Sequence, residues 1–208
     1  MRHFDLHCDT LSRCAAAKET LLQNEGAVSV ERGLIFDCWV QAFAAFIGDS
    51  HRGEEAYQDF LSQVAVLREA MESSEKIVAY DPHHLQEGVC NAMLTVENGA
   101  ALGGKLERIE EFARLGVKVF SLVWNGENEL AGGVESETGL TEFGRKAVRE
   151  LEAHHMVVDV SHLNTMSFWD LCEVAERPFI ATHSNCFEIC PHKRNLDDLQ
   201  IQEIIRRK

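Results

Sequence analysis

Short apolar runs alternate with amphipathic helical patterns along nearly the whole chain. A helix is clearest over residues 55–71, where apolar side chains recur every three or four positions. Further helices are predicted over residues 105–115, 141–154, 164–174 and from 196 onward. The apolar runs predict strands over residues 4–7, 34–46 (one strand or two), 76–80, 91–96, 117–123, 156–160 and 178–182. Strands that alternate with helices are typical of parallel β-α-β units.

The pattern contains about six such units and predicts a single α/β domain over residues 1–208. Two architectures fit it: an open doubly wound sheet, or most of a (β/α)8 barrel. A complete barrel takes about 250 residues, and this sequence of 208 residues ends in a helical pattern with no strand after it. If the fold is a barrel, we therefore expect it to be incomplete in this sequence.

The charge balance narrows the class of partner. The chain has 20 Lys and Arg against 34 Asp and Glu, a net charge of −14. Such a surface repels phosphate backbones and anionic lipids, so we expect neither a nucleic-acid nor a membrane partner. The N-terminus resembles no signal peptide, and the longest apolar stretch, residues 38–47, is too short to cross a bilayer. A cytoplasmic protein is the expectation.

The cysteines predict reduced thiols rather than a disulfide framework. There are seven, scattered and without a C-x-x-C pair, in a chain long enough to bury its own core. Cys186 and Cys190 lie four residues apart and leave a zinc half-site open as an alternative. No second pair with matching spacing accompanies them.

Polar residues with ligand chemistry follow four of the predicted strands. His7 and Asp9 follow the first strand, Glu97 follows the strand at 91–96, and His162 and His183 follow the last two. The carboxyl ends of parallel strands form the edge that carries the active site in α/β folds. The five residues therefore predict a metal site at that edge.

Imidazole and carboxylate ligands without thiolates suit Zn²⁺ or Mn²⁺ and argue against a structural zinc knot. His7 and Asp9, two apart on an extended segment, would point the same way and hold one ion, while Cys8 between them would face the opposite side as a small buried hydrophobe. Glu97 has two oxygens and could bridge two ions. The alternatives are hydrogen-bonded structural histidines and a turn role for Glu97.

Six ordered segments make the chain resemble a known family. They are residues 5–10 (DLHCDT), 96–99 (VENG), 139–144 (GLTEFG), 158–162 (VDVSH), 181–185 (ATHSN) and 194–198 (RNLDD). In these segments the chain is similar to the bacterial branch of the renal or membrane dipeptidases, the zinc metallopeptidase family M19. The segments run from residue 5 to residue 198, so the resemblance covers essentially the whole chain.

The resemblance implies a (β/α)8 barrel of the metal-dependent hydrolase type with two zinc ions at its C-terminal rim. His7 and Asp9 would hold one zinc, His162 and His183 the other, and Glu97 would bridge both as the catalytic carboxylate. The implied reaction is hydrolysis of dipeptides that carry a free C-terminal carboxylate, including ones with a D-residue, by a zinc-activated water.

The resemblance also assigns the substrate side of the site. Arg194 would hold the substrate carboxylate in a bidentate contact, with a surface salt bridge to Asp197 or Asp198 as the alternative. Trp124 stands where many family members have a rim histidine and cannot titrate in its place. Asn125 beside it is the candidate donor to the oxyanion.

The family pattern includes a C-terminal third that residues 1–208 do not contain. An Asp thought to handle the proton belongs to that third, so we expect it beyond residue 208. We then expect residues 1–208 alone to bind zinc with little or no peptidase turnover. The competing functions are a catalytically impaired metal-binding remnant and an amidohydrolase acting on another small amide or lactam. A homodimer is a candidate assembly.

Overall fold

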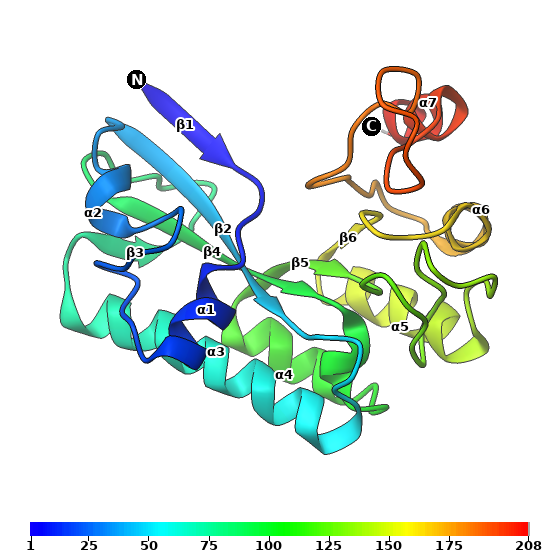
Figure 1. Cartoon of the computed structure of the whole chain (residues 1–208), viewed down its shortest axis with the longest axis horizontal. Helices are drawn as coiled ribbons and strands as arrows, with labels where there is room; N and C mark the ends of the chain where they lie inside the picture. The colour runs from blue at the N-terminus through cyan, green and yellow to red at the C-terminus, as the bar shows by residue number, and fades with distance from the viewer. Residues whose placement is uncertain (208) are drawn as a thin grey trace. The chain divides into compact units, whose positions relative to one another are not determined.

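A computed structural model describes residues 1–207 of the chain, and Figure 1 shows its elements. The strands are β1 (Arg2–Asp5), β2 (Cys38–Phe46), β3 (Ile77–Ala79), β4 (Cys90–Glu97), β5 (Val117–Ser121) and β6 (Val157–Asp159). The helices are α1 (Thr10–Ala17), α2 (Val30–Gly33), α3 (Gly53–Ser73), the 3₁₀ helix η1 (Gly99–Leu102), α4 (Arg108–Leu115), α5 (Glu142–Ala153), α6 (Thr165–Val174) and α7 (Asp198–Arg206).

The chain divides into two compact units. The first comprises Met1–Phe46 and Gln58–Thr95, and the second comprises Ile47–Tyr57 and the chain from Val96 onward. The chain passes between the units directly after β2, inside α3 and inside β4. A single domain over residues 1–208 stays a prediction.

Parallel strands build the first unit. β1 pairs with β2 from Arg2 opposite Cys38 to Asp5 opposite Gln41, and the two run side by side in Figure 1. β4 is the other neighbour of β2, and β3 pairs in parallel with β4. Eight of the nine residues of β2 are buried, as expected for an apolar strand with a neighbour on each side.

Helix α3 supports the end of β2 through one side chain. The backbone N–H of Phe46 donates to Gln63 Oε1 at 3.0 Å, and Gln63 Nε2 donates to the carbonyl oxygen of Phe46 at 2.7 Å. Gln63 is buried, so its carboxamide satisfies backbone groups that would otherwise lack partners. The apolar face predicted for this helix is buried through Phe60, Val64 and Leu67.

In the second unit, β5 and β6 form a parallel pair whose last residues carry polar side chains. Ser121 at the end of β5 lies opposite Asp159 at the end of β6. Ile180 forms a parallel bridge with Asp159 on the other side. Helix α5 contacts both β6 and α6, and Thr141 caps its N-terminus by accepting a hydrogen bond from Gly144 N at 2.9 Å.

Most elements predicted from the apolar pattern are confirmed, with ends shifted by a few residues. The expected strand at 178–182 is wrong in extent, because only Ile180 pairs with a strand. Pro178 has no N–H, and the N–H of Thr182 donates to the side chain of Asp159 instead of to backbone. Helices α1, α2 and η1 were not predicted. Within residues 1–207 no helix is both long enough and apolar enough to cross a bilayer.

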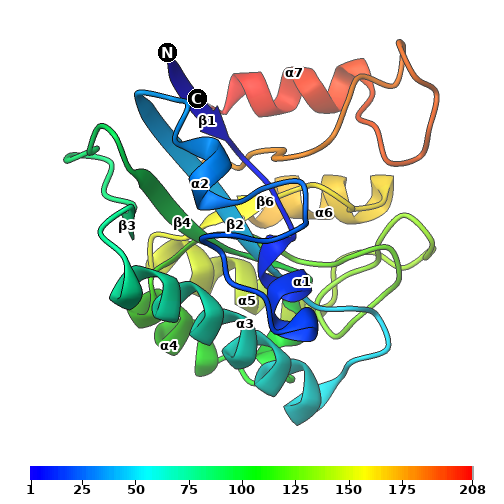
Figure 2. The ribbon, with the colours of Figure 1, turned by 60° about the vertical axis from the view of Figure 1, so that its left-hand side comes forward.

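Helix α7 lies alongside α6, as Figure 2 shows, and Arg207 joins them. The Arg207 guanidinium donates to the carbonyl oxygens of Cys172 and Ala175 and to Glu203 Oε1. These carbonyls belong to the last turn of α6 and its C-cap, where a cation is favourable. Hydrogen bonds from Arg206 and Arg207 lower the pKa of Glu203 to about 2.

We expect this contact to make stability depend on pH through Glu203. Because its pKa is lower in the folded than in the unfolded chain, its contribution is present above about pH 4.5 and is lost as the pH falls toward 2. Glu203→Gln should therefore lower the unfolding free energy at pH 7. Below pH 4.5 the difference in unfolding free energy between the variant and the wild type should shrink. Urea denaturation at each pH measures this, and a pH-independent difference would contradict it.

Candidate metal centre

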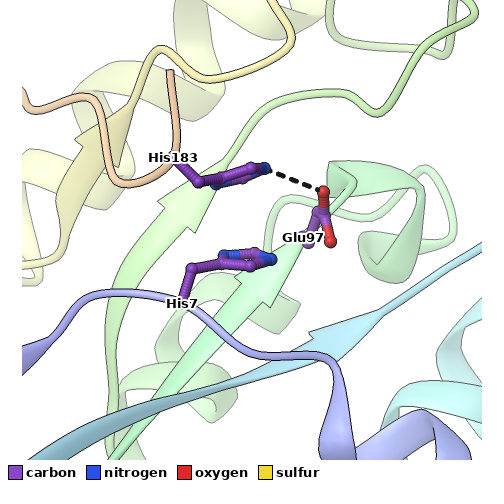
Figure 3. A group of neighbouring side chains, drawn as sticks. All are labelled: His7, Glu97 and His183. Carbon is purple, nitrogen blue, oxygen red and sulfur yellow. Dashed lines mark ion pairs between the residues drawn. The ribbon is translucent and has the colours of Figure 1, made fainter. Parts of the chain in front are cut away.

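The centre of the site in the second unit is a buried carboxylate with two imidazoles. Glu97, the last residue of β4, is only 3% exposed. Its Oε1 lies 2.7 Å from His162 Nε2 and 3.3 Å from His183 Nε2, and Figure 3 draws the pair with His183 as a dashed line. The two Nε2 atoms are 2.9 Å apart. The structure therefore brings together three of the five predicted metal ligands, and the burial of Glu97 is unlike that of an exposed turn residue.

The residues after Glu97 fix its position. Asn98 adopts a left-handed backbone with φ of 81°, and its Nδ2 donates to the carbonyl oxygen of Ile47 at 2.8 Å. Ile47 N in turn donates to the carbonyl oxygen of Glu97 at 3.0 Å. A Cβ on Gly99 would lie 2.8 Å from the carbonyl oxygen of Leu122. The Glu-Asn-Gly sequence thus supplies a candidate ligand, a side chain that stabilises the turn, and a residue small enough for close backbone approach.

Gly99→Ala should consequently destabilise the fold around this turn. The added methyl group would approach a backbone carbonyl, which cannot move aside as a flexible side chain can, and we expect a cost of about 1–2 kcal/mol. Chemical denaturation measures it. Gly48→Ala is the control for glycine replacement, because neither glycine has a positive φ and a Cβ on Gly48 would meet only Ser50 Oγ, at 3.9 Å. Equal losses in the two variants would contradict the packing argument.

His162 reaches Glu97 from a tight turn after β6. Leu163 N donates to the carbonyl oxygen of Val160 at 3.1 Å, and His162 has a φ of 73°. A non-glycine residue held at positive φ costs about 1–3 kcal/mol and is often found at functional sites. Burial lowers the pKa of His162, which favours the neutral imidazole that metals bind.

The donor set fits a divalent metal such as zinc. His162 Nδ1 lies 3.0 Å from Asn125 Oδ1, an acceptor, so Nδ1 carries the imidazole proton and Nε2 offers a lone pair toward Glu97. Two imidazole nitrogens bound to one tetrahedral zinc at about 2.0 Å would be about 3.3 Å apart, close to the separation found here. A buried carboxylate with imidazole nitrogens is the ligand chemistry of zinc sites, and outer-shell bonds such as that of Asn125 commonly orient such histidines.

The other two predicted ligands, His7 and Asp9, lie together in the first unit. His7 Nε2 is 3.2 Å from Asp9 Oδ1. The two side chains therefore point in the same direction, as predicted from their spacing in the sequence. Cys8 between them pairs its backbone with Ala42 and Ala44 of β2. Burial raises the pKa of Cys8 to about 11, which agrees with a small buried hydrophobe rather than a nucleophile.

Arg194 lies half-buried beside the second histidine. Its guanidinium donates to the carbonyl oxygen of His183 at 3.3 Å and to Ser184 Oγ at 3.4 Å. Burial lowers the pKa of Arg194, and the negative charges of Glu97 and Asp159 partly offset this by raising it. In the described part of the chain it forms no ion pair with Asp197 or Asp198, and Asp197 instead caps α7. The salt-bridge alternative therefore finds no support.

Two further predicted residues lie near His162. Trp124 places its ring centroid 6.4 Å from that of His162. Asn125 uses its carboxamide oxygen on His162, which leaves its amide nitrogen as the group available to a ligand. Cys186 and Cys190 join no cluster of possible ligands among residues 1–207, so the zinc half-site alternative also finds no support.

Sequence reasoning missed the polar group beneath the histidines. Asp159 is 1% exposed and accepts hydrogen bonds from Ser121 Oγ at 2.7 Å and from the backbone N–H groups of Ser161 at 2.9 Å and Thr182 at 3.1 Å. One signal was present: an Asp inside the apolar run of residues 156–160. A charged side chain in a buried strand requires partners, and these connect the two segments that carry His162 and His183.

Comparison with known proteins places this chain in a family. The family model described as membrane dipeptidase, peptidase family M19, matches residues 1–208. An uncharacterised protein of the pqqA 5′ region of Klebsiella pneumoniae is 31% identical over 156 residues, covering 68% of this chain and 58% of the relative. Dipeptidase tcpJ of Claviceps purpurea is 29% identical over 151 residues, covering 68% and 36%. The chain thus spans between about one third and three fifths of the length of these relatives.

A solved structure agrees in fold. The metallopeptidase from Rhodobacter sphaeroides, liganded with a phosphinate mimic of the dipeptide L-Ala-D-Ala, matches with a TM-score of 0.86 at 22% identity. The match covers 100% of this chain and 72% of that one. This likeness confirms the predicted barrel-type α/β class. Because the family model matches the chain throughout, the chain belongs to the membrane dipeptidase family, peptidase family M19.

Proposed function

We propose that the chain forms the metal centre of a dipeptidase that hydrolyses short peptides with a free C-terminal carboxylate. The observation that carries the proposal is the buried Glu97 carboxylate with the Nε2 atoms of His162 and His183 beside it. Burying a carboxylate costs several kcal/mol unless charge or hydrogen bonds compensate it, and a bound cation provides that compensation. Family membership supports a metal-dependent peptidase over other uses of such a site.

The proposed site holds two zinc ions. His7 and Asp9 would hold one ion, His162 and His183 would hold the other, and Glu97 would be the ligand shared by both. When bound, the metal pair supplies an activated water and polarises the scissile carbonyl. The protein side chains hold the ligand atoms in place: Asn125, for example, fixes the orientation of the His162 ring through Nδ1.

Arg194 determines the substrate class in this proposal. Its planar guanidinium matches a carboxylate in two parallel hydrogen bonds. Its partners in the structure are a carbonyl oxygen and a hydroxyl, and it forms no salt bridge within residues 1–207. A carboxylate bound next to the metal ligands places the adjacent peptide bond at the reaction centre, which selects dipeptides. The Rhodobacter sphaeroides metallopeptidase is liganded with a phosphinate mimic of L-Ala-D-Ala. That ligand supports including substrates with a C-terminal D-residue in the proposal.

Trp124 and Asn125 complete the substrate side of the proposal. The indole of Trp124 offers apolar contact and a single N–H donor, and the amide nitrogen of Asn125 is the candidate donor to the carbonyl oxygen under attack. Neither side chain titrates near neutral pH. Proton transfer to the leaving amine therefore belongs to another group.

Release of alanine from L-Ala-D-Ala by the zinc-loaded protein tests this function. The Glu97→Gln variant gives the background rate. We expect zinc-dependent release that a chelator abolishes and added zinc restores, with no release from the C-terminally amidated dipeptide. Equal rates for wild type and Glu97→Gln, or equal cleavage of the amide, would contradict the proposal.

A further inference from the structure

The polar group beneath the histidines includes a hydrogen-bonded chain that ends at the ring of His183. Thr182 Oγ1 lies 2.6 Å from Asp159 Oδ2 and 2.7 Å from His183 Nδ1. Both distances are short for hydrogen bonds of their type. This series of hydrogen bonds therefore runs from the buried carboxylate of Asp159 through the Thr182 hydroxyl to His183 Nδ1, the ring nitrogen that faces away from Glu97.

The direction of each bond follows from what the groups can donate. A carboxylate only accepts, so the single hydroxyl proton of Thr182 goes to Asp159. The Thr182 oxygen is then left to accept, and only a proton on His183 Nδ1 can complete the second bond. A neutral imidazole with its proton on Nδ1 has a lone pair on Nε2, the atom that lies 3.3 Å from Glu97 Oε1.

The other contacts of Asp159 hold this arrangement rigid. Ser121 Oγ donates to the same oxygen as Thr182, and the N–H groups of Ser161 and Thr182 donate to the other oxygen. Ser161 Oγ accepts from the backbone N–H of His183 at 3.1 Å. The carboxylate thus has four donors and little freedom to turn, and the Thr182 hydroxyl stays aimed at it.

We infer that Asp159 and Thr182 are positioning residues that fix the tautomer of His183, keeping its proton on Nδ1 and its Nε2 available to a metal. The inference deepens the proposed function and rests on it for the identity of the ligand. The tautomer itself is a property of the metal-free protein. Outer-shell partners of this kind typically contribute 10- to 100-fold in metal affinity.

The test compares Thr182→Val, which removes the hydroxyl at nearly constant shape, with Thr182→Ser, which keeps it. Long-range ¹H–¹⁵N correlation spectra of the metal-free protein at pH 8 report each histidine tautomer, with His183 assigned by its loss in His183→Gln. We expect the Nδ1–H form in wild type and Thr182→Ser and a shift toward Nε2–H in Thr182→Val. Zinc affinity, measured by competition with a chromophoric chelator, should fall about 10- to 100-fold in Thr182→Val and less than about threefold in Thr182→Ser.

Two results would overturn the inference. One is an Nε2–H tautomer of His183 in the metal-free wild type, which decides the matter even if Thr182→Val fails to fold. The other is a folded Thr182→Val with unchanged tautomer and unchanged zinc affinity. A wild type that binds no zinc but shows the Nδ1–H tautomer would contradict the proposed function and not the assignment of the proton, so the two failures are distinguishable.

Discussion

Replacing Glu97 with glutamine is expected to remove zinc from the protein and abolish any hydrolysis. The variant keeps the size of the side chain but loses the negative charge that faces His162 and His183. Outer-shell substitutions alone cost 10- to 100-fold in metal affinity, so loss of a ligand shared by both ions should exceed about 100-fold. Competition with a chromophoric chelator measures the affinity.

Glu137→Gln is the matched control for the loss of one carboxylate, because Glu137 is exposed. It should leave zinc affinity unchanged. Thermal unfolding of both metal-free variants shows whether the fold persists. Undiminished zinc binding by folded Glu97→Gln would disprove the bridging assignment, and equal losses in the two variants would show a nonspecific effect of charge.

Replacing Arg194 with alanine is expected to weaken binding of a phosphinate dipeptide mimic without changing metal content. Hydrogen bonds to charged groups are worth about 1.5–3 kcal/mol, so the dissociation constant should rise about 10- to 150-fold. Isothermal titration calorimetry of the zinc-loaded protein measures this without requiring turnover.

Arg194→Lys separates charge from geometry. Lysine keeps the positive charge but lacks the planar fork, so its affinity should lie between those of wild type and Arg194→Ala. A mimic without the C-terminal carboxylate should bind all three proteins equally weakly. If that mimic bound wild type as tightly as the parent compound, Arg194 would have no carboxylate to hold and the substrate class would be wrong.

The sequence predicted the fold well where one periodicity dominates. The helix at residues 55–71 became α3, and Gly116 ends α4 in the left-handed conformation expected of a C-cap glycine. The pattern failed where backbone groups pair with side chains. The segment around Pro178 looks apolar enough for a strand, but Thr182 N bonds to the carboxylate of Asp159, a contact that no local pattern reveals.

The candidate ligands could be selected from the sequence because parallel strands bring their carboxyl ends to one edge, and ligand-type residues follow four of the predicted strands. Their supporting residues could not. Asp159 and Thr182 differ from ordinary structural residues only through contacts between segments about twenty residues apart. The role of Asn125 was likewise hidden: its type suggested a donor to substrate, whereas its oxygen orients His162. Such hydrogen bonds depend on which residues lie close together in the folded chain. The periodicity and composition of the sequence do not predict that.

The number of zinc ions bound per chain tests the central claim most directly. The wild-type protein is loaded with zinc, freed of excess metal by desalting, and analysed by inductively coupled plasma mass spectrometry against protein concentration. A binuclear site predicts two zinc ions per chain. A wild-type chain that retains no zinc, or only one ion whatever the loading concentration, would contradict the account.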